Sequence, residues 1–166
     1  MFSSGGRSPE ENARSIVLRQ LNSAPRTRAQ LEQALSRRGC DEDVARRVLD
    51  RFQEVGLIDD EAYAGMLVRS QRSNRSLARR ALRVELRKKG VPDAFVESAL
   101  AEVSDSDEQD EARKVVEKRL RTMRGLPRET QARRLAGVLA RKGYPGEIAY
   151  SVIRRALEDL PEHRRD

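Results

Sequence analysis

The sequence contains few of the residues on which most enzymatic sites depend. It has one cysteine, one histidine and no tryptophan, and aromatic residues make up 4% of it. A single cysteine excludes an intramolecular disulfide framework. His163 is the one histidine, which argues against a histidine-dependent triad and a zinc site. Two other segments of the chain resemble the one around Cys40, and they carry the apolar residues Val91 and Tyr144 at its position. We therefore interpret Cys40 as a core residue and not a nucleophile.

Long apolar runs and phosphate-binding loops are also absent from the sequence. No stretch approaches the roughly 20 apolar residues that span a bilayer, and the N-terminal residues lack the apolar run of a signal peptide. No loop of the form G-x-x-x-x-G-K-[ST] occurs, so nothing points to nucleotide hydrolysis. We therefore expect a cytoplasmic, non-enzymatic protein without a cofactor or a resident metal.

Charged residues, in contrast, are abundant. They make up 37% of the 166 residues, which equals the hydrophobic share. The 34 Lys and Arg outnumber the 27 Asp and Glu, giving a formal net charge of +7. Such an excess favours nucleic acid or an acidic protein as a partner. Ala, Leu, Arg and Glu dominate the composition, which predicts an all-α fold.

One pattern occurs three times, anchored on Gly39, Gly90 and Gly143. Leucine stands eight and four residues before each glycine, two basic residues directly precede it, and an apolar residue follows it. Leucines four apart form the buried stripe of a helix, and glycine ends a helix in the left-handed conformation. Cations in the last turn oppose the negative end of the helix dipole. The three glycines are therefore predicted to form the turns of a repeat.

A further helix precedes each of these helix pairs, so each repeat is predicted to contain three helices. The predicted segments are, in order, a flexible tail at 1–10, three-helix repeats at 11–59, 60–104 and 105–160, and a flexible tail at 161–166. Breaks after the first helix of each repeat are expected at 22–28, 71–76 and 122–128. Small stacked repeats bury surface mainly against their neighbours. We therefore expect three tandem three-helix repeats that form an elongated, curved body.

Cations are concentrated in the middle repeat. Residues 69–89 hold nine basic residues and one acid, Glu85. On a helix, Arg79, Arg83 and Arg87 share one face beside the leucine face. Like charges at this spacing repel by roughly 0.2–0.5 kcal/mol per pair, and an anionic partner would relieve that repulsion. The alternative interpretation is a solvated basic face without a partner.

The candidates for contact with an anionic partner are basic residues of the middle and third repeats: Arg72, Arg75, Arg79, Arg80, Arg83, Arg87, Lys88, Lys89, Arg141 and Lys142. An acidic stretch at 104–111 follows the middle repeat. Its carboxylates are expected to stabilise the N-terminus of the next helix. An intramolecular contact with the basic middle repeat is the alternative.

Three stretches resemble the RecX family of bacterial regulatory proteins. They are "EVGLIDDEAYA" (54–64), "RSLARRALRVELRKKGV" (75–91) and "LARKGYPGEIAYSVI" (139–153). The resemblance covers about residues 13–160 and is in phase with the repeats. The chain departs from the family pattern at Ala78, where a glycine is expected, and at Ala81, where an arginine is expected.

The resemblance implies a non-enzymatic modulator of the RecA recombinase in homologous recombination, DNA repair and the SOS response. Such proteins lie in the groove of the filament that RecA forms on single-stranded DNA. There they suppress ATP hydrolysis, strand exchange and co-protease activity. The basic candidates would then contact DNA phosphates or acidic RecA surface. We expect a monomer without membrane contact.

A stand-alone, weakly sequence-specific basic DNA-binding module is the alternative function. Helix–turn–helix units are also short three-helix bundles. However, Asn and Gln suited to reading base edges are scarce near the basic helix ends. Any DNA contact would therefore involve mainly phosphates and would depend strongly on salt.

Overall fold

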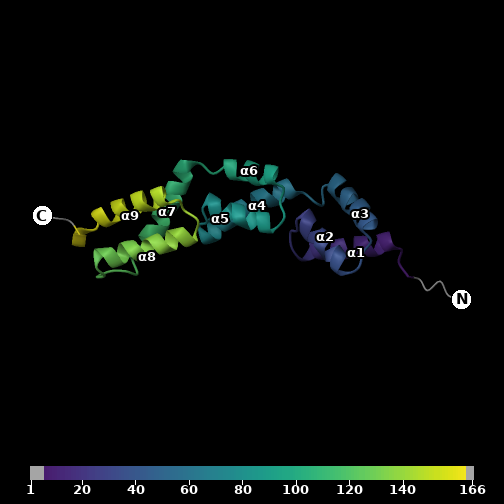
Figure 1. The fold of residues 1–166 in the computed structure, drawn as a ribbon, viewed down its shortest axis with the longest axis horizontal. Helices are drawn as coiled ribbons and strands as arrows, with labels where there is room; N and C mark the ends of the chain where they lie inside the picture. The colour runs from purple at the N-terminus through teal and green to yellow at the C-terminus, as the bar shows by residue number, and fades with distance from the viewer. Residues whose placement is uncertain (1–5, 164–166) are drawn as a thin grey trace. The chain divides into compact units, whose positions relative to one another are not determined.

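The structure is a computed structural model, which describes residues 6–163. These residues form nine α-helices and one 3₁₀ helix, and no strand occurs among them. In chain order the helices are α1 (Pro9–Ser23), α2 (Arg28–Arg37), α3 (Glu42–Glu54), α4 (Asp60–Arg75), α5 (Arg79–Lys88), α6 (Asp93–Ala101), α7 (Asp105–Leu120), α8 (Arg128–Arg141), α9 (Gly146–Glu158) and the 3₁₀ helix Pro161–His163 (Figure 1). The predicted all-α fold is confirmed. None of the described helices combines the length and the apolarity that crossing a bilayer requires.

The chain divides into two compact units. Unit 1 comprises the residues up to Met66 together with Leu86–Val96, and unit 2 comprises Leu67–Glu85 together with the residues from Glu97 onward. The division runs through α4, α5 and α6, so both units include parts of the second helix triplet.

The core of unit 1 is built by α1, α2 and α3, which pack against one another (Figure 1). Leu31 and Leu35 of α2 and Leu49 of α3 are at most 1% exposed. Full burial of such a side chain contributes roughly 2 kcal/mol. A capping box starts α2: the Thr27 hydroxyl accepts the Gln30 N–H, and the Gln30 side chain accepts the Thr27 N–H.

The core of unit 2 centres on α7, α8 and α9, and α9 packs against both other helices. Val116, Leu135 and Leu139 are fully buried in it. A second capping box starts α7, in which Ser104 and Asp107 each accept the other's backbone N–H. The acidic stretch 104–111 therefore does stabilise a helix N-terminus, as one of the two interpretations expected.

The repeat pattern corresponds to buried positions in all three copies. The leucines eight and four residues before the glycines are at most 1% exposed: Leu31, Leu35, Leu82, Leu86, Leu135 and Leu139. After the glycines, Val91 and Tyr144 are buried, whereas Cys40 is partly buried against the core of unit 1. The predicted leucine stripes are thus confirmed.

The predicted break at 71–76 is wrong for its first five residues, because α4 continues through Arg75. Residues 71–75 contain neither glycine nor proline. Side chains also bond one helical turn back, from Asn74 Nδ2 to Ser70 Oγ at 3.4 Å and from Arg75 Nη1 to Gln71 Oε1 at 3.3 Å. The chain turns at Ser76, whose φ is +52°.

The predicted tails at 1–10 and 161–166 lie partly outside the described residues, at 1–5 and 164–166. Within the described part, α1 already begins at Pro9, and the Ser8 hydroxyl accepts the Glu11 N–H at 3.2 Å. Near the other end, residues 161–163 form the 3₁₀ helix, and His163 Nε2 lies 2.6 Å from Gln131 Oε1. These hydrogen bonds connect the ends of the described chain to structured residues.

Candidate interaction surface

Each repeat glycine ends a helix in the left-handed conformation. The φ angles of Gly39, Gly90 and Gly143 are +74°, +80° and +91°, a region that costs residues with a Cβ roughly 1–2 kcal/mol. In each copy the residue after the glycine donates its N–H to the carbonyl five residues earlier, as from Val91 to Leu86 at 3.1 Å. This closure places the basic pair of each repeat at the helix end.

Gly90 and Gly143 have a second role, which their spacing alone does not reveal. A Cβ on Gly90 would overlap the Cβ of Ala29, and one on Gly143 would lie 2.7 Å from the Cβ and the backbone nitrogen of Ala81. Gly39 has open space at the same place. Ala81, where an arginine was expected, therefore lies at a close contact between the end of α8 and the start of α5.

The turn between α4 and α5 is bound by side chains from the third helix triplet. The Ser76 hydroxyl donates to Glu111 Oε1 at 2.9 Å, and the Ser76 carbonyl accepts from the Tyr144 hydroxyl at 2.6 Å. Lys142 Nζ donates to the carbonyl of Arg75 at 2.7 Å. Burial raises the pKa of Tyr144, so its hydroxyl remains a donor. The basic ends of α4 and α8 thus meet within unit 2.

Arg79, the first arginine of the predicted row on α5, is bound to the acidic stretch. Its guanidinium pairs with the carboxylates of Asp105 and Glu108 and donates to the Val103 carbonyl at 3.1 Å. Hydrogen bonds to Asp105 and Glu108 raise the pKa of Arg79, although burial opposes the shift. The intramolecular contact between the acidic stretch and the basic repeat is therefore present, in addition to the helix capping described above.

Glu108 also completes the start of α5. It is 3% exposed, and its Oε1 accepts the backbone N–H of Arg79 at 2.6 Å. Unit 1 contains a similar arrangement, since Asp60 Oδ1 accepts the N–H of Arg28, the first residue of α2, at 2.9 Å. A carboxylate at a helix N-terminus satisfies an unpaired N–H and the positive end of the dipole. In both cases a carboxylate from the next triplet caps the basic helix.

The other two arginines of the row are paired as well. Arg83 binds both carboxylate oxygens of Glu97, at 2.9 and 3.1 Å, and the hydrogen bond to Glu97 raises the pKa of Arg83. Arg87 Nε lies 3.3 Å from Asp93 Oδ1. All three guanidiniums of α5 therefore have carboxylate partners within the protein. The row that the helical spacing predicts exists, but its charge is largely compensated.

Four other cations lie together in unit 2: Arg75, Lys118, Arg119 and Lys142. We call this group the Lys142 cluster. The pKa of Lys142 is lowered by burial first and then by the charges of Arg119, Arg75 and Lys118. Arg75 is bound to Glu85 at 2.7 Å, whereas Lys118 and Arg119 are exposed and form no ion pair with the described residues. Mutual repulsion of this kind is relieved when an anion binds.

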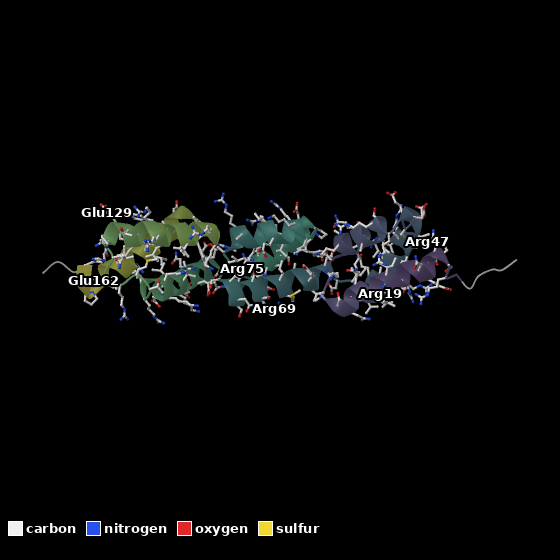
Figure 2. The ribbon with its side chains drawn as sticks, turned by 90° about the horizontal axis from the view of Figure 1, so that it is seen from below. Arg19, Arg47, Arg69, Arg75, Glu129 and Glu162 are labelled. Carbon is white, nitrogen blue, oxygen red and sulfur yellow. The ribbon has the colours of Figure 1, made fainter. Side chains whose placement is uncertain are left out.

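The remaining candidates are distributed over both units. Arg80 and Arg141 in unit 2 and Lys88 and Lys89 in unit 1 are exposed, and no ion pair involves them in the described part of the chain. Arg72 is half-buried and lies near enough to Tyr144 to lower its pKa slightly, against the effect of burial. Arg75 and Arg69 of α4 are labelled in Figure 2. Of the ten basic residues that the sequence suggested as contact candidates, the structure therefore brings Arg75 and Lys142 into one cluster. The other eight lie outside that cluster.

Sequence reasoning named Arg141 and Lys142 but missed the wider basic region around them, residues 112–146, which we call the C-terminal basic segment. It holds eleven basic residues and two acids, Glu117 and Glu129. Within the described residues, two of the eleven, Arg113 and Lys114, form ion pairs. The other nine are Lys118, Arg119, Arg121, Arg124, Arg128, Arg133, Arg134, Arg141 and Lys142. Net charge summed over a sliding window of the sequence would have revealed this segment.

The described residues contain no group of three or more His, Cys, Asp or Glu side chains that could hold a metal ion. The candidate surface consists of cationic side chains at helix ends, which suit phosphates or carboxylates.

Comparison with known proteins identifies the family to which this arrangement belongs. Three family models match in order: the first three-helix domain of RecX at residues 13–52, the second at 59–100 and the third at 106–153. A solved structure of RecX from Lactobacillus salivarius superposes with a TM-score of 0.80 at 22% identity and covers 89% of this chain and 96% of that one. This structural likeness supports the fold.

Curated relatives extend the match over nearly the whole chain. Regulatory protein RecX of Streptomyces coelicolor is 50% identical over 156 residues, which cover 94% of this chain and 83% of the relative. The Thermobifida fusca protein of the same name is 47% identical, with 93% and 85% covered. The Mycolicibacterium smegmatis protein is also 47% identical, with 96% and 87% covered. The chain therefore belongs to the RecX family of regulatory proteins.

Proposed function

We propose that this protein binds RecA on single-stranded DNA and lowers the ATPase, recombinase and co-protease activities of the filament. The observation that carries the proposal is the ordered match of all three RecX domains, together with relatives named regulatory protein RecX. The protein would act in the cytoplasm by binding and not by catalysis. It would modulate recombination, DNA repair and the SOS response.

The cations of unit 2 support the same proposal physically. A RecA filament on DNA presents phosphates and protein carboxylates, and both attract Lys and Arg side chains. The Lys142 cluster is the strongest candidate for this contact, because Lys118 and Arg119 have no ion pair within the described residues. The arginines of α5 contribute less directly, since each already binds an internal carboxylate.

ATP hydrolysis by RecA on single-stranded DNA tests the proposed function. We expect the purified protein to lower the hydrolysis rate at amounts equal to or below those of RecA. The protein added to RecA without DNA is the control for effects on free RecA. An unchanged rate of ATP hydrolysis over a range of salt concentrations would refute the proposal.

The C-terminal basic segment also favours a second candidate, direct binding to naked DNA. Contact through phosphates predicts an affinity that falls steeply and linearly on a logarithmic salt scale. Labelled single-stranded and double-stranded oligonucleotides, measured at two salt concentrations, distinguish the two functions. Tight binding to naked DNA without an effect on RecA would favour the second candidate, and the reverse result would favour the first.

A further inference from the structure

A groove lies between α7 and α9 in unit 2 and has a volume of about 470 Å³. Its apolar lining is provided by Leu120, Val152, Ala156 and Leu160, and the last three of these are only partly buried. The groove extends to Glu162 of the 3₁₀ helix, which is labelled in Figure 2. Apolar side chains at the base of an open groove are a usual feature of sites that bind a helix.

The corresponding hollow in unit 1 is smaller, and an ion pair spans it. A hollow of about 280 Å³ lies between α1 and α3. Phe52, which lines it, is 5% exposed, and Arg47 Nε binds Glu10 Oε1 of α1 at 2.9 Å across it. The ion pair joins the two helices, and the phenyl ring lines the hollow between them.

Two substitutions between the repeats accompany this difference. When the chain is aligned on Gly39 and Gly143, Arg47 corresponds to Ser151 and Phe52 to Ala156. Both replacements shorten the side chain, so α9 neither fills the groove nor bridges it. The other lining positions of α3, Val48 and Arg51, correspond to Val152 and Arg155 and are thus unchanged in type. The larger volume of the groove therefore coincides with shorter side chains on α9.

The charge around the groove selects the kind of occupant. Arg121, Arg124 and Arg155 line it and form no ion pair with the described residues. Residues 118–128 include five cations and no acid, so the end of the groove beyond α7 is basic. Among the acids of the lining, Glu162 accepts a hydrogen bond from Gln131 at 3.3 Å. Glu117 and Asp159 offset the arginines in part, and a basic end beside an apolar base remains.

We propose that this groove docks an acidic amphipathic helix of a partner protein. Leucine-like side chains of that helix would fill the space above Leu120, Val152 and Ala156, and its carboxylates would pair with Arg121 and Arg124. The lining holds no aromatic side chain on which a base could stack, which disfavours nucleic acid as the occupant. The proposal does not depend on RecA being that partner.

Fluorescence anisotropy of a labelled peptide tests the proposal. The probe is a 15-residue peptide with leucines at positions i, i+3, i+4 and i+7 and glutamates elsewhere on the helix. We expect it to bind the full chain. We also expect the double variant Ser151→Arg/Ala156→Phe, which introduces the residues of the first repeat, to bind at least tenfold more weakly. Ala136→Phe, on an exposed position of α8 outside the groove, is the matched control and should bind like the unchanged protein.

A second variant keeps the test independent of packing. Arg121→Gln/Arg124→Gln changes exposed residues and should weaken binding about fivefold while reducing its salt dependence. Peptides in which serine replaces leucine, or lysine replaces glutamate, should bind no more than weakly. Equal binding of the acidic peptide to the unchanged and groove-filled proteins would overturn the proposal. Preference for the lysine peptide would overturn it as well. The effect of the variant Ser151→Arg/Ala156→Phe on ATP hydrolysis by RecA is measured separately. That measurement tests the proposed function independently of peptide binding.

Discussion

Two regions of the chain are rich in positive charge, yet the structure uses them differently. On α5, Arg79, Arg83 and Arg87 each bind a carboxylate of the same protein. In the C-terminal basic segment, nine of eleven cations have no ion pair within the described residues. Local density of basic residues therefore does not measure the charge that is available to a partner.

The difference arises from where the acids lie in the chain. Asp105 and Glu108 follow Arg79 by more than 25 residues, and the fold returns them to α5. Among the described residues, none of the acids after the C-terminal basic segment forms an ion pair with its cations. We therefore propose that Arg79 and Arg83 of α5 mainly stabilise unit 2, and that the cations of α7 and α8 mainly contact a partner.

The largest expected effect is the loss of stability on removal of Glu108. Glu108→Ala leaves the Arg79 N–H and guanidinium without this buried acceptor. We expect the free energy of unfolding to fall by about 2–3 kcal/mol, which is below the usual cost of breaking a buried pair because Arg79 is partly exposed. Urea denaturation followed by circular dichroism measures it. Glu129→Ala, at an exposed acid in the first turn of α8, is the control. Similar losses for both variants would contradict the structural role.

A matched pair of charge variants tests whether the unpaired cations of α7 contribute more to partner binding than the paired arginines of α5. Lys118→Gln/Arg119→Gln and Arg83→Gln/Arg87→Gln each remove two positive charges, so general attraction to an anionic partner falls equally. We expect the first variant to bind a RecA filament on single-stranded DNA about tenfold more weakly, because its cations are unpaired. The second should weaken binding less than threefold. Anisotropy of the labelled protein gives both affinities, and the reverse order would restore the α5 row as the contact surface.

The repeat architecture could be predicted from the sequence because its signals are local. Leucines four and eight residues before Gly90, for example, lie within the same short helix, and both are buried. The glycine that follows them ends the helix through its own backbone conformation. Patterns of this kind depend on residues within about two helical turns of one another, so no knowledge of the tertiary fold is needed.

The candidate surface was harder to predict because its determinants are distant in sequence. The pairing of Arg83 with Glu97 spans 14 residues, and that of Arg79 with Glu108 spans 29. Helical spacing places the arginines on one face but cannot tell which carboxylates reach that face. The approach of Lys142 to Arg75 spans 67 residues and depends on the turn at Ser76. Both findings required the tertiary structure.

A smaller effect on stability is expected when Arg83 or Arg87 of α5 loses its charge. The side chains of Arg83 and Arg87 are 34% and 56% exposed. Exposed pairs usually contribute less than about 1 kcal/mol and are screened by salt. We expect Arg83→Gln to lower the free energy of unfolding more than Arg87→Gln, and both differences to shrink in 1 M salt. Arg133→Gln, without an ion pair among the described residues, is the control in the same urea titrations. A loss above about 2 kcal/mol for Arg87→Gln would contradict this ranking.

The smallest expected effect is a change in the titration of Lys142. Burial and the nearby cations lower its pKa in the folded protein. The protonated lysine is therefore penalised by folding, and this penalty is fully present below the folded pKa and disappears as pH rises toward the unfolded value. A phosphate bound at the Lys142 cluster adds negative charge and should raise the pKa again. NMR titration of the lysine side chain, with and without a short oligonucleotide, measures the shift, and Lys142→Gln identifies the signal. An unchanged pKa at saturating oligonucleotide would show that phosphates bind elsewhere, and the comparison between α5 and the C-terminal basic segment would then need a different contact residue.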